Sequence, residues 1–269
     1  MSEKIGVLGC GWLGLPLAKR LLKDSYKVFG TTTSADKLHA LEKEGVHPFK
    51  ISVKPTKIHG DIQGFLSQID VLIINVPPRL RGSQNESFID KMELLHGEIQ
   101  KSGVKKVIFV SSTSVYGNLE GEVTEQTLPN PVTESGKQLV QSEELFLSDP
   151  HISTTIIRFG GLIGPDRHPV TMLSKKQHLT NGNDPVNLIH LEDCIHIISI
   201  ILKNKYWGEV FNGVNPFHPP KIEYYNSEAT KRGLPLPPYQ VDDTHSKAKV
   251  VISKNFLEKG HSFTTSIIS

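Results

Sequence analysis

The chain has 269 residues, of which 37% are hydrophobic and 22% are charged. That length is enough for one large α/β domain, with or without a small second lobe, and the composition excludes a collagen-like chain, a repeat array and a disordered protein. The 30 Lys and Arg residues nearly balance the 28 Asp and Glu residues, and no block of like charge is long enough to follow a phosphate backbone. We therefore expect no nucleic-acid partner.

The sequence also lacks the features of a membrane or secreted protein. No segment reaches the run of about 18 uncharged apolar residues that a membrane span needs, and the N-terminus has no signal-peptide pattern. The two cysteines, Cys10 and Cys194, cannot form a disulfide framework and belong to no metal-ligand cluster. We expect a cytoplasmic protein with no membrane partner and no metal site.

Short apolar runs alternate with amphipathic stretches through the first 160 residues. The predicted strands are 4–8, 27–31, 46–52, 70–76, 105–111 and 154–159, and the predicted helices are 12–23, 35–43, 62–67, 87–101 and 134–146. This alternation is typical of a parallel sheet with helices on both faces. We therefore predict an α/β fold with a doubly wound parallel sheet.

After residue 160 the pattern becomes irregular, and Pro and His are frequent. One amphipathic helix is predicted at 191–203, followed by a strand at 209–212. We expect a core of residues 1–160, completed by 187–212. The remaining residues, 161–186 and 213–269, are predicted to form a small irregular C-terminal lobe that binds substrate.

A glycine-rich loop joins the first predicted strand to the first helix. Residues 9–14 read GCGWLG, a G-x-G-x-x-G in which the first glycine allows a tight turn, the second admits a pyrophosphate and the third lets helix and strand pack closely. The N-terminus of the helix adds free N–H groups and a partial positive charge. This context favours a Rossmann NAD(P) site over a glycine turn without a ligand. The predicted cofactor ligands here are Gly9, Gly11, Trp12, Leu13 and Gly14.

The tip of the second strand decides which dinucleotide fits. An acidic residue about 20 residues beyond the glycine loop would hold the 2′-hydroxyl of NAD. The sequence instead has four hydroxyl residues followed by a lysine: Thr31, Thr32, Thr33, Ser34 and Lys37. Because these groups suit a 2′-phosphate, we predict NADP, with NAD as the alternative. The same hydroxyl residues can instead cap the next helix.

Other predicted strand ends meet at the same edge of the sheet. They carry NVPP at 75–78, SSTSVYG at 111–117 and RFGGLIGP at 158–165, and NLIHLED follows at 187–193. With the glycine loop, these segments resemble the extended short-chain dehydrogenases/reductases of the NAD-dependent epimerase/dehydratase superfamily, and most resemble its atypical YeeZ-like members. Within them, the predicted cofactor ligands are Asn75, Val76, Pro77, Ser111 and Phe159.

The resemblance implies an NADP-dependent oxidoreductase or epimerase/dehydratase that acts on a small anionic or sugar-nucleotide substrate. It also implies a homodimer formed through the helices near 84–101 and 134–148. By the same resemblance, Ser112 matches the hydroxyl that hydrogen-bonds the reacting oxygen.

The catalytic Tyr-x-x-x-Lys of the family is not found at its expected place. Ser135 stands where the tyrosine belongs, and Leu139 stands where the lysine belongs. Since a tyrosine with a pKa of about 10 needs a neighbouring ammonium to act near neutral pH, the standard mechanism is lost. Tyr116 is the remaining candidate proton donor, and a ring packed beside the cofactor is its alternative role. A non-catalytic NADP(H)-sensing regulatory protein is the alternative interpretation of the whole chain.

Cationic loops follow two of the strand ends. Arg79 and Arg81 follow the two prolines at 77–78, and Arg167 follows Pro165. Guanidinium groups bind phosphates and carboxylates in two-point contacts, so we predict that these arginines, with Thr113, contact an anionic substrate. Solvated surface charge is the alternative.

Overall fold

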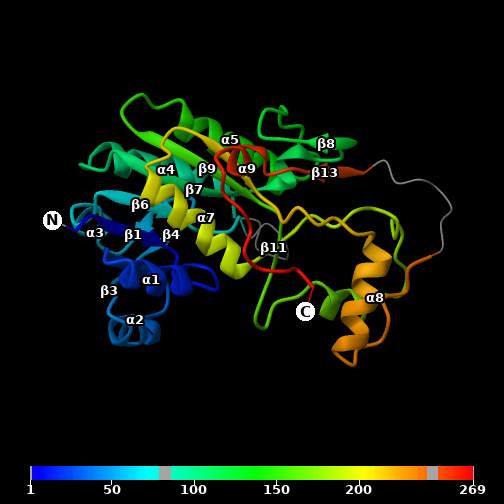
Figure 1. Cartoon of the computed structure of the whole chain (residues 1–269). Coiled ribbons are helices and arrows are strands. Elements are labelled where there is room, and N and C mark those ends of the chain that lie inside the picture. The colour runs from blue at the N-terminus through cyan, green and yellow to red at the C-terminus, as the bar shows by residue number, and fades with distance from the viewer. Residues whose placement is uncertain (1, 79–85, 241–247, 269) are drawn as a thin grey trace.

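The computed structural model describes residues 2–78, 86–240 and 248–268. Its centre is a seven-stranded sheet in the order β12-β9-β7-β6-β1-β2-β3, and all neighbouring strands are parallel (Figure 1). The strands are β1 (Lys4–Leu8), β2 (Lys27–Thr32), β3 (His47–Lys50), β6 (Val71–Ile74), β7 (Lys106–Ser112), β9 (Ser153–Phe159) and β12 (Val210–Gly213). The predicted doubly wound parallel sheet is confirmed.

Helices cover both faces of this sheet, as Figure 1 shows. On one face, α1 (Gly14–Lys23) packs beside α7 (Leu191–Asn204). On the other face lie α3 (Ile62–Leu66), α4 (Phe88–Gln100) and α5 (Glu134–Leu147). All four residues of β6 are fully buried because the sheet is covered on both sides.

Two predicted elements near the β3 edge have different boundaries in the structure. The predicted helix at 35–43 divides into a short 3-10 turn, η1 (Ala35–Lys37), and α2 (Leu38–Lys43). The predicted strand at 46–52 ends early as β3, and β4 (Ser52–Val53) pairs with β5 (Ile58–His59) in a separate antiparallel hairpin. Pro48 is tolerated within β3 because that strand lies at the edge of the sheet.

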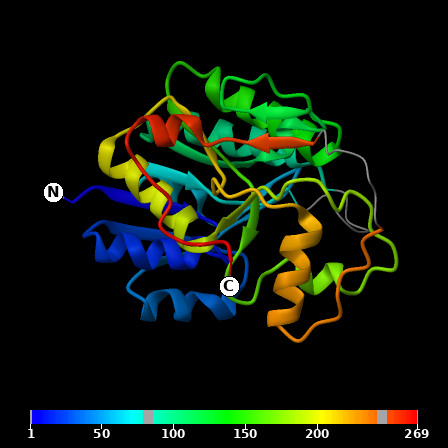
Figure 2. The same cartoon turned by 45° about the vertical axis from the view of Figure 1, so that its right-hand side comes forward.

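The C-terminal lobe has more regular structure than the sequence pattern indicates. β10 (Gly161–Ile163) pairs with β11 (Leu188–His190), and α6 (Val170–Leu173) packs against α8 (Lys221–Lys231) beside them. Figure 2 shows this lobe next to the sheet, with α8 in orange. The periodicity at α8 is weak because its buried face consists of two tyrosines, an alanine and a glutamate rather than a long aliphatic stripe.

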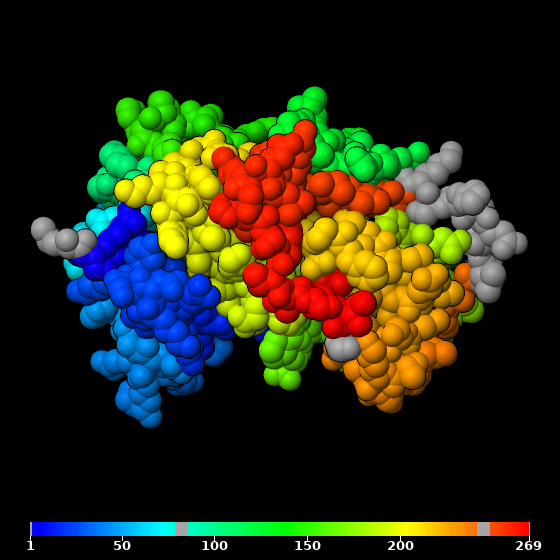
Figure 3. Space-filling model, viewed as in Figure 1, coloured from blue at the N-terminus to red at the C-terminus, as the bar shows by residue number. Residues whose placement is uncertain are grey.

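Part of the C-terminal segment returns to the core. β13 (Lys249–Val251) pairs with β8 (Gly121–Val123), and α9 (Lys254–Glu258) packs against β12 with Phe256 fully buried. The last described residues then run across the boundary between core and lobe, where Figure 3 shows them in red. Residues 249–258 therefore lie on the core rather than in the lobe predicted at 213–269.

Within the described ranges, no helix is both long and apolar enough to cross a bilayer. The same residues bring together no group of three or more potential metal ligands.

Candidate functional site

The candidate site lies where the order of the strands reverses. From β1 the chain builds the sheet outward through β2 and β3, and from β6 it builds in the opposite direction. Ligands of open α/β sheets bind in the crevice at the carboxyl ends of the strands that flank such a reversal. Here Gly9 follows β1, Asn75 follows β6, and the Asn75 amide donates a hydrogen bond to the Gly9 carbonyl at 3.0 Å.

The structure gives a different reason for glycine at each of the three glycine positions in the loop. Gly9 has a φ of +105°, which favours glycine, and its N–H donates to Thr31 Oγ1 at 2.9 Å. A Cβ on Gly14 would lie 2.1 Å from the Gly9 carbonyl oxygen, so helix and strand can approach only without a side chain there. A Cβ on Gly11 would meet no atom within 4 Å. The protein itself therefore does not need the second glycine, and the space above it is open to a ligand.

The N-terminal end of α1 completes this cradle. The helix begins at Gly14 rather than at the predicted position 12, so Trp12 and Leu13 belong to the loop. Leu13 provides no side-chain capping bond, and the first turn holds no acidic residue. The partial positive charge of the helix end is thus not neutralised by a carboxylate of its own first turn, which fits a pyrophosphate beside Gly11.

The hydroxyl residues at the tip of β2 divide into two groups. Thr31 and Thr32 are buried, and their hydroxyls accept hydrogen bonds from the backbone N–H groups of Gly9 and Ser34. Thr33 and Lys37 are exposed, and Ser34 is half-buried without making a side-chain cap on η1. The buried pair shapes the loop, while the outer three residues remain accessible to a ligand.

At the end of β7, Ser112 is partly exposed, whereas the residues on either side of it are buried. Ser112 is half-buried, and its Oγ accepts the Ser114 N–H at 3.2 Å where η2 (Thr113–Tyr116) begins. Ser111 is buried and donates its hydroxyl to Glu143 Oε1 of α5 at 2.5 Å. Thr113 is also buried. Ser112 is thus the most accessible of these three hydroxyl residues.

The remaining predicted cofactor ligands at the strand ends also differ in exposure. Val76 is half-buried and Pro77 is exposed beyond the end of β6. Phe159, at the end of β9, is only 2% exposed and packs in the core with residues of α1 and α7.

Ser135 and Leu139, which the sequence predicts at the positions of the family dyad, both lie on α5. Leu139 is 2% exposed and packs among the apolar residues between α5 and the sheet. Ser135 is half-buried in the first turn, and the nearby Lys137 is exposed to solvent.

Tyr116 has no exposed surface. Its hydroxyl donates to Asn212 Oδ1 and accepts from Arg158 Nη1, both at 2.9 Å. Burial raises the pKa of Tyr116, although the Arg158 guanidinium acts in the opposite direction. The geometry favours the packed ring over the proton donor.

A buried ion pair that the sequence does not predict supports this part of the sheet. Arg158 of β9 binds Glu143 of α5, with 2.6 Å between Nη2 and Oε2 and with both side chains at least 94% buried. Glu143 also holds Ser111, and Arg158 also holds Tyr116, so the pair ties β7, β9 and α5 together. The signal was a charged residue inside a predicted strand of the buried sheet, which requires a partner.

Trp12 connects the glycine loop to the loop at 164–167. Its indole N–H donates to the Pro165 carbonyl at 3.1 Å, and the Arg167 guanidinium lies 4.8 Å from the ring centre. The structure therefore brings Trp12 and Arg167 together, although the sequence predicted different ligands for them. Arg79 and Arg81 lie outside the described residues.

The start of α7 has a structural role. His190 Nδ1 accepts the Glu192 N–H, and the fully buried Asp193 accepts both backbone and side-chain hydrogen bonds from Thr264. Asp193 thus fastens the C-terminal segment to the core.

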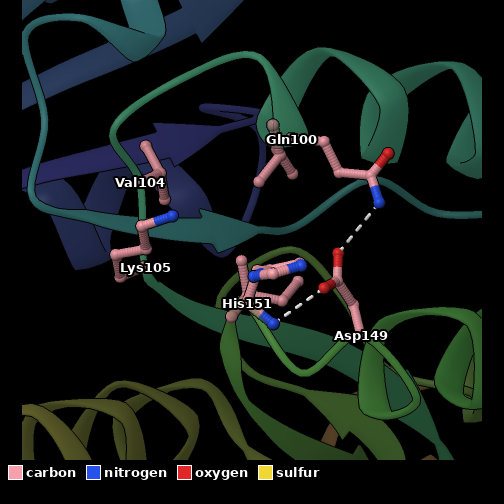
Figure 4. Close-up of a pocket in the computed structure, with 7 residues that line it drawn as sticks. Gln100, Val104, Lys105, Asp149 and His151 are labelled. Carbon is pink, nitrogen blue, oxygen red and sulfur yellow. Dashed lines mark hydrogen bonds between the residues drawn. The ribbon is translucent and has the colours of Figure 1, made fainter.

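Two hollows among the described residues lie elsewhere in the structure. One lies at the amino ends of β7 and β9, at the opposite edge of the sheet from the glycine loop, and is lined by Gln100, Val104, Lys105, Asp149 and His151 (Figure 4). The other lies behind the loop at 164–168 and is lined also by His190, Arg232 and the segment 265–268.

Comparison with known families agrees with this geometry. A family model described as NAD(P)H-binding matches residues 9–187, which is more than half of the chain. The chain belongs to this NAD(P)H-binding family. The Escherichia coli K12 protein YeeZ is 33% identical over 250 residues, covering 93% of this chain and 91% of YeeZ. The predicted resemblance to YeeZ-like epimerase/dehydratase relatives is confirmed.

Further similar proteins carry names of sugar-nucleotide enzymes. The Bacillus subtilis protein named "Uncharacterized UDP-glucose epimerase YtcB" is 26% identical over 239 residues, covering 78% of this chain and 76% of its own. A Thermotoga maritima UDP-glucose 4-epimerase with UDP-glucose has a TM-score of 0.78 at 18% identity, and it covers 98% of this chain and 95% of its own. A Bacillus cereus UDP-glucuronic acid 4-epimerase with UDP-glucuronic acid and NAD has a TM-score of 0.77 at 21% identity, with the same coverage. These two structures share the fold.

Proposed function

We propose that this NAD(P)H-binding protein is an NADP(H)-dependent oxidoreductase or epimerase/dehydratase that acts on a small anionic sugar nucleotide. The observation that carries the proposal is the open space above Gly11, beside a helix start without an acidic first turn. A glycine that the packing of the protein does not require is explained by a ligand that approaches the backbone closely. The names of YtcB and of the two epimerases support the substrate class.

The preference for NADP rests on the outer residues of the β2 tip. Thr33 and Lys37 are exposed and Ser34 is half-buried, so all three are available to a 2′-phosphate, and positions 31–34 hold no carboxylate that would repel it. Lys37→Gln should weaken NADP binding about tenfold and leave NAD binding unchanged. Lys43→Gln is a matched control because Lys43 is also exposed and lies at the far end of α2. Equal effects on NAD and NADP would contradict the preference.

The proposed chemistry assigns one positioning hydrogen bond to Ser112. A bound nicotinamide supplies the hydride acceptor or donor. Because Ser112 Oγ accepts the Ser114 N–H, its own hydrogen is left to donate to an oxygen of the substrate. Leu139 has no ionisable group and Tyr116 has no exposed surface, so any proton transfer uses a group other than these two.

Thermal unfolding and a turnover assay together test this proposal. NADP or NADPH should raise the unfolding midpoint, because a ligand of the native state stabilises it. UDP-glucose or UDP-glucuronic acid should then either be oxidised or reduced, which changes the nicotinamide absorbance, or be epimerised, which inverts one carbon of the sugar. Ser112→Ala should slow this turnover, while NADP should still raise the unfolding midpoint of the variant. No shift with NAD, NADP or their reduced forms would contradict the proposed site.

A second candidate function is NADP(H) sensing without catalysis. The burial of Tyr116 and the presence of a leucine at position 139 favour it, because a sensor needs no accessible acid/base pair. A midpoint shift with NADP(H), combined with no turnover of either sugar nucleotide, would support the sensor.

A further inference from the structure

Arg167 is presented by a rigid turn. Gly164 and Arg167 exchange two backbone hydrogen bonds of 3.0 and 3.1 Å, and Asp166 between them has a φ of +57°. Asp and Asn adopt this left-handed conformation more readily than most residues. The turn therefore fixes the direction in which Arg167 leaves the backbone.

The Trp12 side chain holds this turn against the glycine loop. A Cβ on Gly164 would lie 3.1 Å from Trp12 Cζ2, so the ring packs directly against the turn backbone. The indole N–H binds the Pro165 carbonyl at 3.1 Å, and the Arg167 guanidinium stacks on the ring face. Stacking restricts a long side chain that would otherwise lose entropy on binding a ligand. The guanidinium is thus held next to the residue that follows Gly11.

Arg167 differs from the other arginines in the described ranges by having no carboxylate partner. Arg20 pairs with Asp24, Arg158 with Glu143 and Arg232 with Glu228. Arg167 is exposed, and no acidic group of the described residues lies within ion-pair distance of it. A cation that is oriented by stacking and left unpaired is suited to an anionic ligand.

We propose that Arg167, stacked on Trp12 next to Gly11, binds the pyrophosphate of the dinucleotide. This inference rests on the proposed dinucleotide site and changes the predicted role of Arg167 from a substrate residue to a cofactor residue. The glycine loop supplies backbone N–H groups from the first half of the sheet, and the 164–167 turn supplies a fixed charge from the second half. In this arrangement, called the clamp below, the two loops contact the phosphates from two sides, and the Trp12 ring holds the loops together.

Fragments of the cofactor separate this role from other roles. ADP-ribose contains the pyrophosphate, whereas adenosine 2′-monophosphate does not. In the full chain, Arg167→Gln should weaken ADP-ribose and NADP binding about tenfold, which corresponds to one lost charge-assisted hydrogen bond, and leave adenosine 2′-monophosphate binding unchanged. Lys176→Gln makes the same charge change at an exposed lysine of the lobe and should leave all three affinities unchanged. Binding is measured by calorimetry for the tight ligands and by ligand-observed NMR for the weak one.

The stacking is tested by Trp12→Leu, which keeps an apolar side chain but removes the ring. It should weaken ADP-ribose binding by a similar factor, and the double variant with Arg167→Gln should be little weaker than either single variant, because both remove the same contact. Thermal unfolding of each variant checks that the fold is retained.

Each other result has a defined meaning. Unchanged ADP-ribose affinity in Arg167→Gln, with normal NADP binding by the wild type, overturns the clamp and leaves the proposed function intact. A loss confined to UDP-glucose overturns it by returning Arg167 to the substrate. An equal loss for adenosine 2′-monophosphate overturns it as a general effect of charge. No binding of any dinucleotide by the wild type overturns both proposals.

Discussion

Two regions along the carboxyl edge of the sheet use similar side chains in opposite ways. Beside β1 and β6, a hydroxyl and an amide hold the backbone of the glycine loop and leave the space above Gly11 open. Beside β7, β9 and β12, the polar side chains bind one another in the interior: Ser111, Tyr116, Glu143, Arg158 and Asn212. Position at a strand end therefore does not decide whether a polar group is available to a ligand. The partners that folding supplies decide it.

The interior network should give the largest effect when it is broken. Glu143→Ala leaves the Arg158 guanidinium buried without its carboxylate, and the free energy of unfolding should fall by about 3–5 kcal/mol. Arg158→Met combined with Glu143→Leu should recover most of this loss, because no buried charge remains. Denaturant unfolding measures both, and a loss below about 1 kcal/mol in Glu143→Ala would mean that solvent reaches the pair.

The glycine loop offers a paired test of the open region. Gly14→Ala should lower the free energy of unfolding by about 1–3 kcal/mol, because its Cβ would lie 2.1 Å from the Gly9 carbonyl. Gly11→Ala should change it by less than about 0.5 kcal/mol, because its Cβ meets nothing within 4 Å. The Gly11 variant should nevertheless bind NADP more than about tenfold more weakly, since the methyl group occupies the path of the pyrophosphate. Undiminished NADP affinity would show that the open space does not hold the phosphates.

The contrast between the glycine loop and the interior network also explains which parts of the structure could be predicted from the sequence. The glycine loop depends on local geometry, because a strand, a tight turn and a helix follow one another within a few residues. The glycine spacing at 9–14 was therefore enough to predict the loop. The parallel sheet was predictable for a similar reason, since each strand shows its apolar run locally.

The interior network could not be predicted in this way. It joins positions 111, 116, 143, 158 and 212, which lie on separate elements and meet only after the sheet and α5 pack. The sequence indicated only that Arg158 in an apolar strand needs a partner, and many carboxylates could have provided one. The contact between Trp12 and Arg167 was hidden for the same reason, because 153 residues separate Trp12 from Pro165 in the turn it binds.

Tyr116 tests the contrast at a single hydroxyl. Tyr116→Phe removes the group that Arg158 and Asn212 share, and the free energy of unfolding should fall by about 1 kcal/mol. Turnover of a confirmed substrate should stay within about twofold of the wild type, because the hydroxyl has no exposed surface. Ser112→Ala is the matched variant on the accessible side. It should lower turnover, and loss of its cap on the Ser114 N–H should cost about 1 kcal/mol of stability, as in Tyr116→Phe. A large loss of turnover in Tyr116→Phe, with an unchanged fold, would make this hydroxyl part of the chemistry.

The smallest expected effect is a pH dependence at the far end of the network. Glu125 binds the Asn212 backbone N–H through Oε1, while Oε2 is buried with no hydrogen-bond partner among the described residues. Burial raises the pKa of Glu125 above its ordinary value of 4.5, although backbone N–H groups act against the shift. The folded protein therefore holds this proton more tightly than the unfolded chain does. The stability that the protonated group contributes is complete below pH 4.5 and is lost as the pH rises through the raised pKa. Glu125→Gln cannot ionise, so this part of the decline with pH should disappear from its unfolding free energy. If the variant and the wild type instead lose stability in parallel as the pH rises, then solvent reaches Glu125, and Glu125 is not part of the buried interior network.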